Sequence, residues 1–348
     1  MPVRIVPHNA PMTNPSRPST LAVAIALGTV YILWGSTYLA IAYVVETMPP
    51  FLAGGVRFLF AGAMLIAFLV ARDRWRRRRS NDVARIAAPR AVEWRTALIV
   101  GTLLLLGGNG GVMLAEQTVP SGIAAVIIAT TPIWFSLFDA LTTRRAPSRL
   151  AIGGVLIGLV GVAILLLPTG GIERLDPLGI GILLGAAICW ASGSIYARQA
   201  PMPPSRLLGA GMQQVAGGLV LLLVATGTGE VARFDPAAVS TESLLGFVFL
   251  IVFGSLAAFS AYAWLLHHVP VTTVATYAYV NPLVAVGLGI AFRGETLSGR
   301  SLLAAAIIIG AVVAMVSGRP SQAEESGPSP EVAALAPEET EQPEEGAA

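Results

Sequence analysis

Long apolar stretches separated by short polar segments dominate the 348-residue chain. A helix that crosses a bilayer needs about 20 mostly apolar residues and must satisfy its own backbone hydrogen bonds, so each stretch predicts one membrane span. The stretches are residues 21–45, 51–71, 96–115, 119–141, 150–168, 178–197, 207–226, 244–264, 271–292 and 301–318. The pattern therefore predicts an all-α integral membrane protein with ten transmembrane helices.

Arginine is unevenly distributed among the segments that join these stretches. If the N-terminus lies in the cytoplasm, 17 arginines fall on the cytoplasmic side and four on the external side. Cytoplasmic loops of membrane proteins keep an excess of positive charge, so both termini are predicted to face the cytoplasm. The run RDRWRRRR has the composition of a nucleic-acid-binding patch, but beside a span it indicates orientation instead, and no nucleic-acid partner is predicted.

Composition then narrows the function classes. Charged residues make up 12% of the chain, about half the fraction found in soluble domains. All 22 basic residues are arginine, so the chain can form neither the lysine-containing phosphate loop of an ATP-driven pump nor a Schiff base. Cys189 is the single cysteine, and His267 and His268 have no further ligand residues close in the sequence. Neither a cofactor nor a metal site is predicted.

The two halves of the chain repeat one another in order. Trp34 in YILWGSTYLAI matches Trp190 in AICWASGSIYA, and QTVPSGIAAVIIATTPIW matches HHVPVTTVATYAYVNPLV. In the second pair, Pro132 and Pro282 lie 150 residues apart, as do the prolines near the start of each segment. A repeat of five spans inserts its second copy upside down. Inverted repeats with a central binding site are typical of secondary transporters.

Four parts are predicted along the chain. A disordered cytoplasmic N-terminus (residues 1–20) precedes the first five-helix repeat (21–168) and the second (169–318). The tail, residues 319–348, carries eight glutamates and no arginine after its first residue. It is rich in Glu, Pro and Ala, and we expect it to be disordered because it cannot bury enough apolar surface to fold.

Motifs spread over residues 20–318 resemble a known family. They are WGSTYLAI, PPFLAGGVRFLFAG, GGNGGVMLAEQTVPSGIAAVIIATTP, and TYAYVNPLVAVGLG followed by GETL. Together they are similar to the EamA family of the drug/metabolite transporter superfamily, bacterial ten-helix exporters of small metabolites. The resemblance implies efflux from the cytoplasm by alternating access, with a cavity formed mainly by the first four helices of each half. It implies no particular substrate, and it leaves proton coupling open.

Two ionisable residues are the first candidates for function. Arg57 lies inside the second span, where a charge costs about 2.5–3.5 kcal/mol on insertion scales, and it could attract a carboxylate or phosphate of the substrate. The alternative is that Arg57 reaches the nearby headgroups or a helix-end carbonyl. Glu116 ends the third span and is a candidate for gating or proton coupling, against the alternative of a solvated helix end.

Uncharged residues predict a more distributed substrate site. Tyr31, Trp34 and Tyr38 share one face of the first span, and Tyr277 and Asn281 share one face of the ninth. Aromatic rings and hydroxyls suit an amphipathic metabolite, whereas helix–helix hydrogen bonding would use the same residue types. The candidate cavity residues are Trp34, Ser36, Tyr38, Arg57, Asn109, Thr131, Trp190, Ser194, Gln213, Tyr277 and Asn281.

Pro132 and Pro282 occupy matching positions in the fourth and ninth spans. Each removes one intrahelical hydrogen bond, so a kink is expected that frees backbone carbonyls and provides a hinge. A packed kink without a mechanistic role is the alternative.

The function that agrees with all of these features is export of a small metabolite by an inner-membrane secondary transporter. The expected partners are a small-molecule substrate, the lipid bilayer and, as an option, protons. A flippase for lipids or lipid-linked carriers is the alternative on the same fold. A polytopic membrane enzyme is a further alternative, although no acid/base or nucleophile set for it is evident.

Overall fold

A computed structural model describes residues 19–79, 87–143, parts of 153–164, 176–269, 274, 276–296 and 298–317. Most of the predicted N-terminal segment, most of the predicted fifth span (150–168) and the acidic tail (319–348) lie outside these ranges. The described residues are helical, with turns and short connections and no strand. This confirms the all-helical class.

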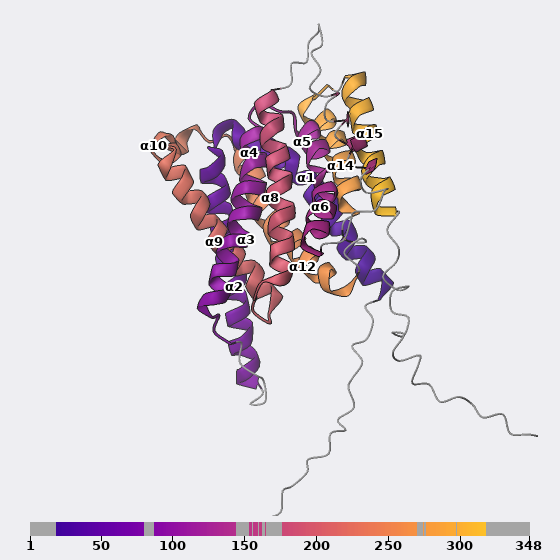
Figure 1. Ribbon diagram of the computed structural model, residues 1–348. Coiled ribbons are helices and arrows are strands. Elements are labelled where there is room, and N and C mark those ends of the chain that lie inside the picture. The colour runs from indigo at the N-terminus through magenta and orange to yellow at the C-terminus, as the bar shows by residue number, and fades with distance from the viewer. Residues whose placement is uncertain are drawn as a thin grey trace, which may run out of the picture.

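The helices form an elongated bundle (Figure 1). In chain order they are α1 (Thr20–Thr47), α2 (Pro50–Arg79), α3 (Ala91–Gly101), the π-helical segment η1 (Thr102–Gly110), α4 (Gly111–Ala115), α5 (Ser121–Ile128), α6 (Thr131–Thr143), α8 (Pro177–Gln199), α9 (Arg206–Gly227), α10 (Glu230–Arg233), the 3-10 turn η2 (Pro236–Ala238), α11 (Thr241–Phe249), the π-helical segment η3 (Leu250–Ala258), α12 (Phe259–His268), α14 (Tyr277–Arg293) and α15 (Gly299–Ser317).

Six helical runs are long and apolar enough to cross a membrane. They are Thr20–Thr47, Pro50–Arg79, Ala91–Ala115, Pro177–Gln199, Arg206–Gly227 and Thr241–Leu265. Three shorter apolar helices, Ser121–Phe135, Val280–Arg293 and Gly299–Ala311, overlap three further predicted stretches. Nine of the ten stretches therefore coincide with apolar helices, six of them at full spanning length.

Large apolar side chains cover the outside of this bundle. Leu21, Phe60, Leu223 and Phe292 are each more than half exposed. They belong to a long series of exposed large apolar residues on the described helices, which a water-soluble protein rarely shows and for which lipid tails are a suitable solvent. The exposure therefore agrees with a membrane location.

Polar residues begin three of the long helices. Ser19 accepts a hydrogen bond from the Ala22 N–H (3.2 Å) at the start of α1, and Ser205 accepts one from the Leu208 N–H (3.4 Å) at the start of α9. Asp176 accepts one from the Leu178 N–H (3.0 Å) before Pro177 at the first turn of α8. These caps satisfy backbone donors that the helices themselves cannot pair.

Two helices of the bundle contain a π-helical segment at matching places. The run Ala91–Ala115 contains η1, and the run Thr241–Leu265 contains η3. Each segment has nine residues. π-Helical segments are uncommon in proteins, but those that do occur are often located at functional sites. The wider turn changes the directions in which side chains point.

The fourth and ninth predicted spans differ from each other. Helix α5 ends at Ile128 and α6 begins at Thr131, so the helical structure is interrupted just before Pro132. Pro282 instead lies inside α14, which continues beyond it. Pro132 therefore lies in the first turn of a new helix, where a proline removes no intrahelical hydrogen bond, whereas Pro282 lies within a continuous helix. A hinge at either proline stays a prediction.

Glycines allow α2 and α9 to approach closely. A Cβ atom on Gly62 would lie 2.7 Å from the Gly211 carbonyl oxygen, and one on Gly218 would lie 2.6 Å from the Leu59 nitrogen. No larger side chain fits between the two backbones at these points. This contact joins the second and seventh predicted spans, and Arg57 extends from the same helix α2 into the interior.

Candidate functional site

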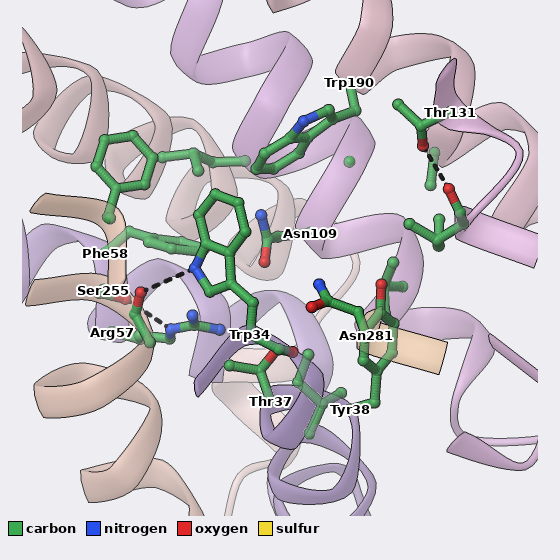
Figure 2. A pocket seen from close by; sticks show the side chains of 18 of the residues that line it. Trp34, Thr37, Tyr38, Arg57, Phe58, Asn109, Thr131, Trp190, Ser255 and Asn281 are labelled. Carbon is green, nitrogen blue, oxygen red and sulfur yellow. Dashed lines mark hydrogen bonds between the residues drawn. The ribbon is translucent and has the colours of Figure 1, made fainter. Parts of the chain in front are cut away.

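A cavity of about 90 Å³ lies in the interior of the bundle (Figure 2). This is several times the roughly 10–15 Å³ that one water molecule requires. The residues that line it are Trp34, Thr37, Tyr38, Ile41, Arg57, Phe58, Leu105, Gly108, Asn109, Val112, Ile128, Thr131, Ala186, Trp190, Gly254, Ser255, Phe259, Tyr277 and Asn281. They come from both halves of the chain and include both π-helical segments.

Arg57 is the charged residue among them. Its side chain is buried, and the residue is 3% exposed. The Nε atom donates a hydrogen bond to Ser255 Oγ (2.9 Å), and the guanidinium carbon lies 4.5 Å from the centre of the Phe58 ring. The Nη1 atom has no hydrogen-bond partner. A buried guanidinium with an unsatisfied donor is available to an anion that enters the cavity.

Aromatic rings form another wall of the cavity. The Trp34 ring centre lies 6.0 Å from that of Trp190, 5.2 Å from that of Tyr277 and 4.8 Å from that of Tyr262. The contacts with Trp190 and Tyr277 are edge-to-face, a geometry that aromatic pairs favour. Trp34 Nε1 donates to the Gly254 carbonyl (3.4 Å), which links this wall to η3.

Polar groups on α1 and α14 lie near the same wall. Asn281 is 5% exposed, and with its amide nitrogen toward the two carbonyls it donates to Tyr277 O and Tyr31 O (3.2 Å each). The Tyr31 hydroxyl lies 2.5 Å from Thr276 Oγ1. These bonds connect the first and ninth predicted spans, so Asn281 both contacts the cavity and joins two helices.

Eight of the eleven predicted cavity residues line the cavity. They are Trp34, Tyr38, Arg57, Asn109, Thr131, Trp190, Tyr277 and Asn281. Ser36 and Ser194 are not in the lining: their hydroxyls donate to Ile32 O (2.6 Å) and Trp190 O (2.7 Å) within their own helices. Gln213 is also absent from the lining, whereas its neighbour Gln214 is fully buried and donates to Ser255 O (3.5 Å).

Eleven further residues line the cavity, among them Phe58, Gly254, Ser255 and Phe259. A serine or phenylalanine in an apolar span carries little signal of its own. The pair Gly254–Ser255 interrupts the apolar run of the eighth predicted span in the same way that GGNGG interrupts the third. A comparison of these two interruptions is the pattern that could have indicated Ser255.

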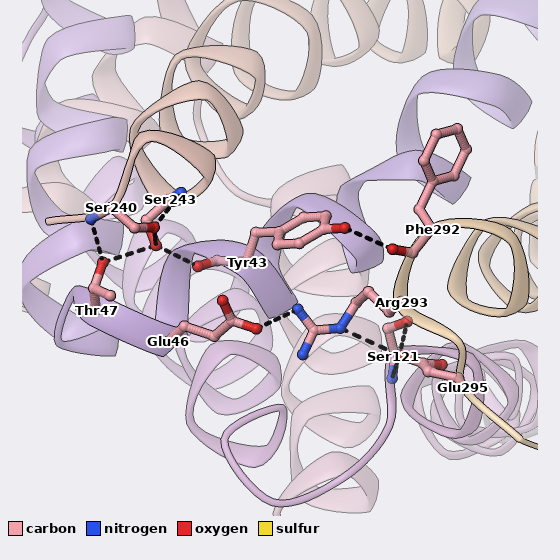
Figure 3. Close-up of polar contacts among 9 residues, drawn as sticks. All are labelled: Tyr43, Glu46, Thr47, Ser121, Ser240, Ser243, Phe292, Arg293 and Glu295. Atoms are coloured by element: carbon pink, nitrogen blue, oxygen red, sulfur yellow. Dashed lines mark hydrogen bonds and ion pairs between the residues drawn. The ribbon is translucent and has the colours of Figure 1, made fainter.

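A layer of polar contacts joins helices at the end of the bundle that carries α10, opposite the arginine-rich end of α2 (Figures 1 and 3). We call these contacts the polar layer. Thr47 Oγ1 donates to Ser243 Oγ (2.7 Å), which donates to Tyr43 O (2.6 Å). Arg293 pairs with Glu46 (2.6 Å). These contacts fix α1 to α11 and to α14.

Two glutamates of the same end cap helix N-termini. Glu295 accepts hydrogen bonds from the Ser121 N–H (3.1 Å) and hydroxyl (2.7 Å) and from the Gly122 N–H (3.2 Å), at the start of α5. Glu230 accepts one from the Leu52 N–H (2.8 Å) near the start of α2. The positive end of a helix dipole favours a carboxylate at such a position. Burial of the Glu230 carboxyl outweighs its hydrogen bonding to the backbone and raises its pKa above the ordinary value.

Glu116 lies close to the polar layer but makes none of its bonds. The residue is 7% exposed, and neither carboxylate oxygen has a hydrogen-bond partner. It directly follows α4, and the charges of Glu295 and Arg293 act on it, while its own charge acts on Tyr38. The alternative of a solvated helix end does not hold for Glu116, because the surrounding helices bury the residue. A role in gating or proton coupling stays a prediction.

The fold and the site define a class of protein: a polytopic α-helical membrane protein with an interior cavity lined by both halves of its chain. The model of the EamA-like transporter family matches residues 21–167 and again residues 177–317. The chain belongs to this family, and the resemblance noted from its motifs is confirmed.

Individual relatives agree with this assignment. The chain is 39% identical over 298 residues to the inner membrane transporter YedA of Escherichia coli strain K12, covering 84% of this chain and 90% of YedA. It is 31% identical over 223 residues to the threonine/homoserine exporter RhtA of Salmonella typhimurium, covering 64% of this chain and 71% of RhtA. A solved crystal structure shares the fold, with a TM-score of 0.57 and 22% identity over 85% of this chain and 96% of that chain.

Proposed function

We propose that the protein is a secondary active transporter of the bacterial inner membrane that exports a small metabolite by alternating access. Its relatives are named as transporters, exporters and efflux pumps. The observation that carries the proposal is the interior cavity, which residues of both halves line. A site between two similar halves can open to one side or the other as the halves change their relative tilt.

We further propose that the halves are five-helix repeats of opposite orientation. Support comes from the two successive matches to one family model and from the π-helical segments η1 and η3, whose first residues lie 148 positions apart. The arginines predict the arginine-rich end of α2 in the cytoplasm. In this orientation the polar layer closes the cavity on its external side.

The polar layer is proposed as the external gate. Its contacts join α1 to α11 and to α14, and Glu295, which lies at the same end of the bundle, joins the end of α14 to α5. Each of these contacts must separate if the cavity is to open outward between these helices. Surface ion pairs and hydroxyl bonds contribute only about 0–1.5 kcal/mol each, so they can break and reform during a transport cycle.

Candidate substrates are amino acids, amines and nucleobase-like or toxic analogues. Two relatives are named for amino-acid export: RhtA for threonine and homoserine, and a probable amino-acid metabolite efflux pump of Salmonella typhimurium. The cavity, with its mixture of rings, hydroxyls and one charge, is of the kind that binds small amphipathic molecules.

Counterflow in proteoliposomes tests transport directly. Vesicles preloaded with one unlabelled candidate substrate should accumulate the same compound in labelled form, and vesicles without protein should not. The Arg95→Gln variant changes an exposed arginine of α3 and should behave as the unmodified protein. If no compound exchanges, a flippase for lipids or lipid-linked carriers becomes the better account.

A reversible cross-link tests the gate. The Thr47 and Ser243 hydroxyls lie 2.7 Å apart, so cysteines at both positions bring two short side chains within reach of a disulfide. In a Cys189→Ser background, oxidation of this pair should stop counterflow, and reduction should restore it. Full transport by the oxidised pair would exclude opening between α1 and α11.

A further inference from the structure

The cavity places one positive charge in the protein interior without a negative partner. Arg57 is 3% exposed, and the ion pairs found within the described ranges involve other arginines. No aspartate or glutamate of the described chain lines the cavity. An isolated buried charge is strongly unfavourable, and an arginine held in this way needs an anion from elsewhere.

The guanidinium is also held in a defined orientation. Its Nε donates to Ser255 Oγ (2.9 Å), its carbon lies 4.5 Å from the Phe58 ring centre, and Nη1 has no partner. Because the guanidinium is planar, a fixed Nε also fixes the direction of the remaining N–H groups. Arg57 is therefore prepared to bind an anionic group before that group arrives.

The rest of the lining is suited to an uncharged body. Trp34, Trp190 and Tyr277 present rings to the cavity, and Ile41, Leu105 and Val112 add aliphatic surface. A ligand that fits both parts has one anionic group and one apolar portion. A second negative charge would find no second cation, and an ammonium group would find no carboxylate.

We propose that the cavity binds a small monocarboxylate, with its carboxylate on the Arg57 guanidinium and its apolar body against Trp34 and Trp190. This inference rests on the proposed function and specifies the substrate class of the same site. It predicts an order of affinity for ligands that share one apolar body: the monocarboxylate binds most tightly, the α-amino acid less tightly, and the amine and the dicarboxylate least.

Binding to the purified full-length protein tests this order without any variant. The probes are isocaproate, leucine, isoamylamine and isobutylsuccinate, which share a branched aliphatic body. Titration calorimetry and the ligand-induced shift in melting temperature should favour isocaproate over isoamylamine by at least about tenfold, since a charge-assisted hydrogen bond to a buried group is at stake. Equal binding of the amine, or no binding of isocaproate, would overturn the proposal.

Variants separate a ligand-binding arginine from a structural one. Arg57→Gln should lower isocaproate affinity at least about tenfold, while Arg95→Gln on the exposed face of α3 should leave it unchanged. Without ligand, Arg57→Gln should melt at the same temperature as the unmodified protein or higher, because the variant loses an uncompensated charge. A lower melting temperature together with unchanged isocaproate binding would assign Arg57 to folding alone.

The failure of this inference differs from the failure of the transport proposal. Exchange of amines but not of carboxylates in counterflow would leave the protein a transporter and remove Arg57 as the anion site. Binding of isocaproate without exchange of any compound would keep the site and contradict secondary transport.

Discussion

Arg57 Nε and Ser255 Oγ lie 2.9 Å apart, and their hydrogen bond joins α2 of the first half to the π-helical segment η3 of the second. The bond lies at the wall of the interior cavity. It orients the only charged side chain of the described lining, and it connects two helices that alternating access would move relative to one another.

Removal of that bond should weaken ligand binding. In Ser255→Ala the guanidinium loses its fixed orientation, and a hydrogen bond to a charged group contributes about 1.5–3 kcal/mol, so the affinity for the transported substrate should fall about tenfold or more. The matched control is Ser192→Ala, whose hydroxyl bonds to Ile188 O in its own helix. Equal affinities of the two variants would show that Ser255 does not position Arg57.

Glu116 is expected to carry the proton if transport is proton-coupled. Its buried carboxylate has no hydrogen-bond partner, which disfavours the charged form, and it interacts electrostatically with Tyr38, Glu295 and Arg293. Glu116→Gln should therefore abolish accumulation driven by an imposed pH gradient while exchange at equal pH continues. The control is Glu242→Gln on the exposed face of α11. Retained pH-driven accumulation in Glu116→Gln would assign coupling to another group.

The α2–α9 contact should not tolerate a side chain at Gly218. A Cβ there would lie 2.6 Å from the Leu59 nitrogen, and overpacking of this kind costs about 1–3 kcal/mol. Gly218→Ala should lower the free energy of unfolding in detergent by that amount. Gly227→Ala in the same helix meets no described atom within 4 Å and should be neutral. An unchanged stability of Gly218→Ala would mean that the two helices can separate slightly without cost.

Asp176 should make stability depend on acidity. The Thr118 hydroxyl donates to Asp176 (2.7 Å) and holds its pKa below the ordinary value of 3.8. A lowered folded-state pKa stabilises the protein above the unfolded pKa, and this stabilisation is lost as the pH falls through the folded pKa. Between neutral and acidic pH, the melting temperature of Asp176→Asn should fall less than that of the unmodified protein.

A matched aspartate provides the control for that measurement. Asp235 also caps a helical turn, through a bond from the Ala237 N–H (2.9 Å), but it lies outside the contact between Thr118 and α8. Asp235→Asn should retain the acid sensitivity of the unmodified protein. Parallel melting curves for Asp176→Asn and the unmodified protein across the acidic range would contradict the assigned role.

Part of the interior site could be predicted from the sequence. Trp34, Tyr38 and Arg57 could be identified because rings and a charge are conspicuous within apolar spans, and helical periodicity places the first two on one face. Ser36 satisfies the same criteria, yet its hydroxyl bonds to Ile32 O. A hydroxyl can pair with the carbonyl one turn earlier in any helix, so residue type alone does not distinguish the two outcomes.

The sequence by itself determined the helical class, the position of most spans and the presence of a charge within the second, because each depends on the length and composition of one continuous segment. The tertiary structure alone decided that Arg57 meets Ser255, that Glu295 caps α5, and that helices bury Glu116. These relationships join residues more than 170 positions apart, or depend on which helices surround a residue. The local sequence pattern carries no information about which distant residues come into contact, whereas close packing between helices determines those contacts.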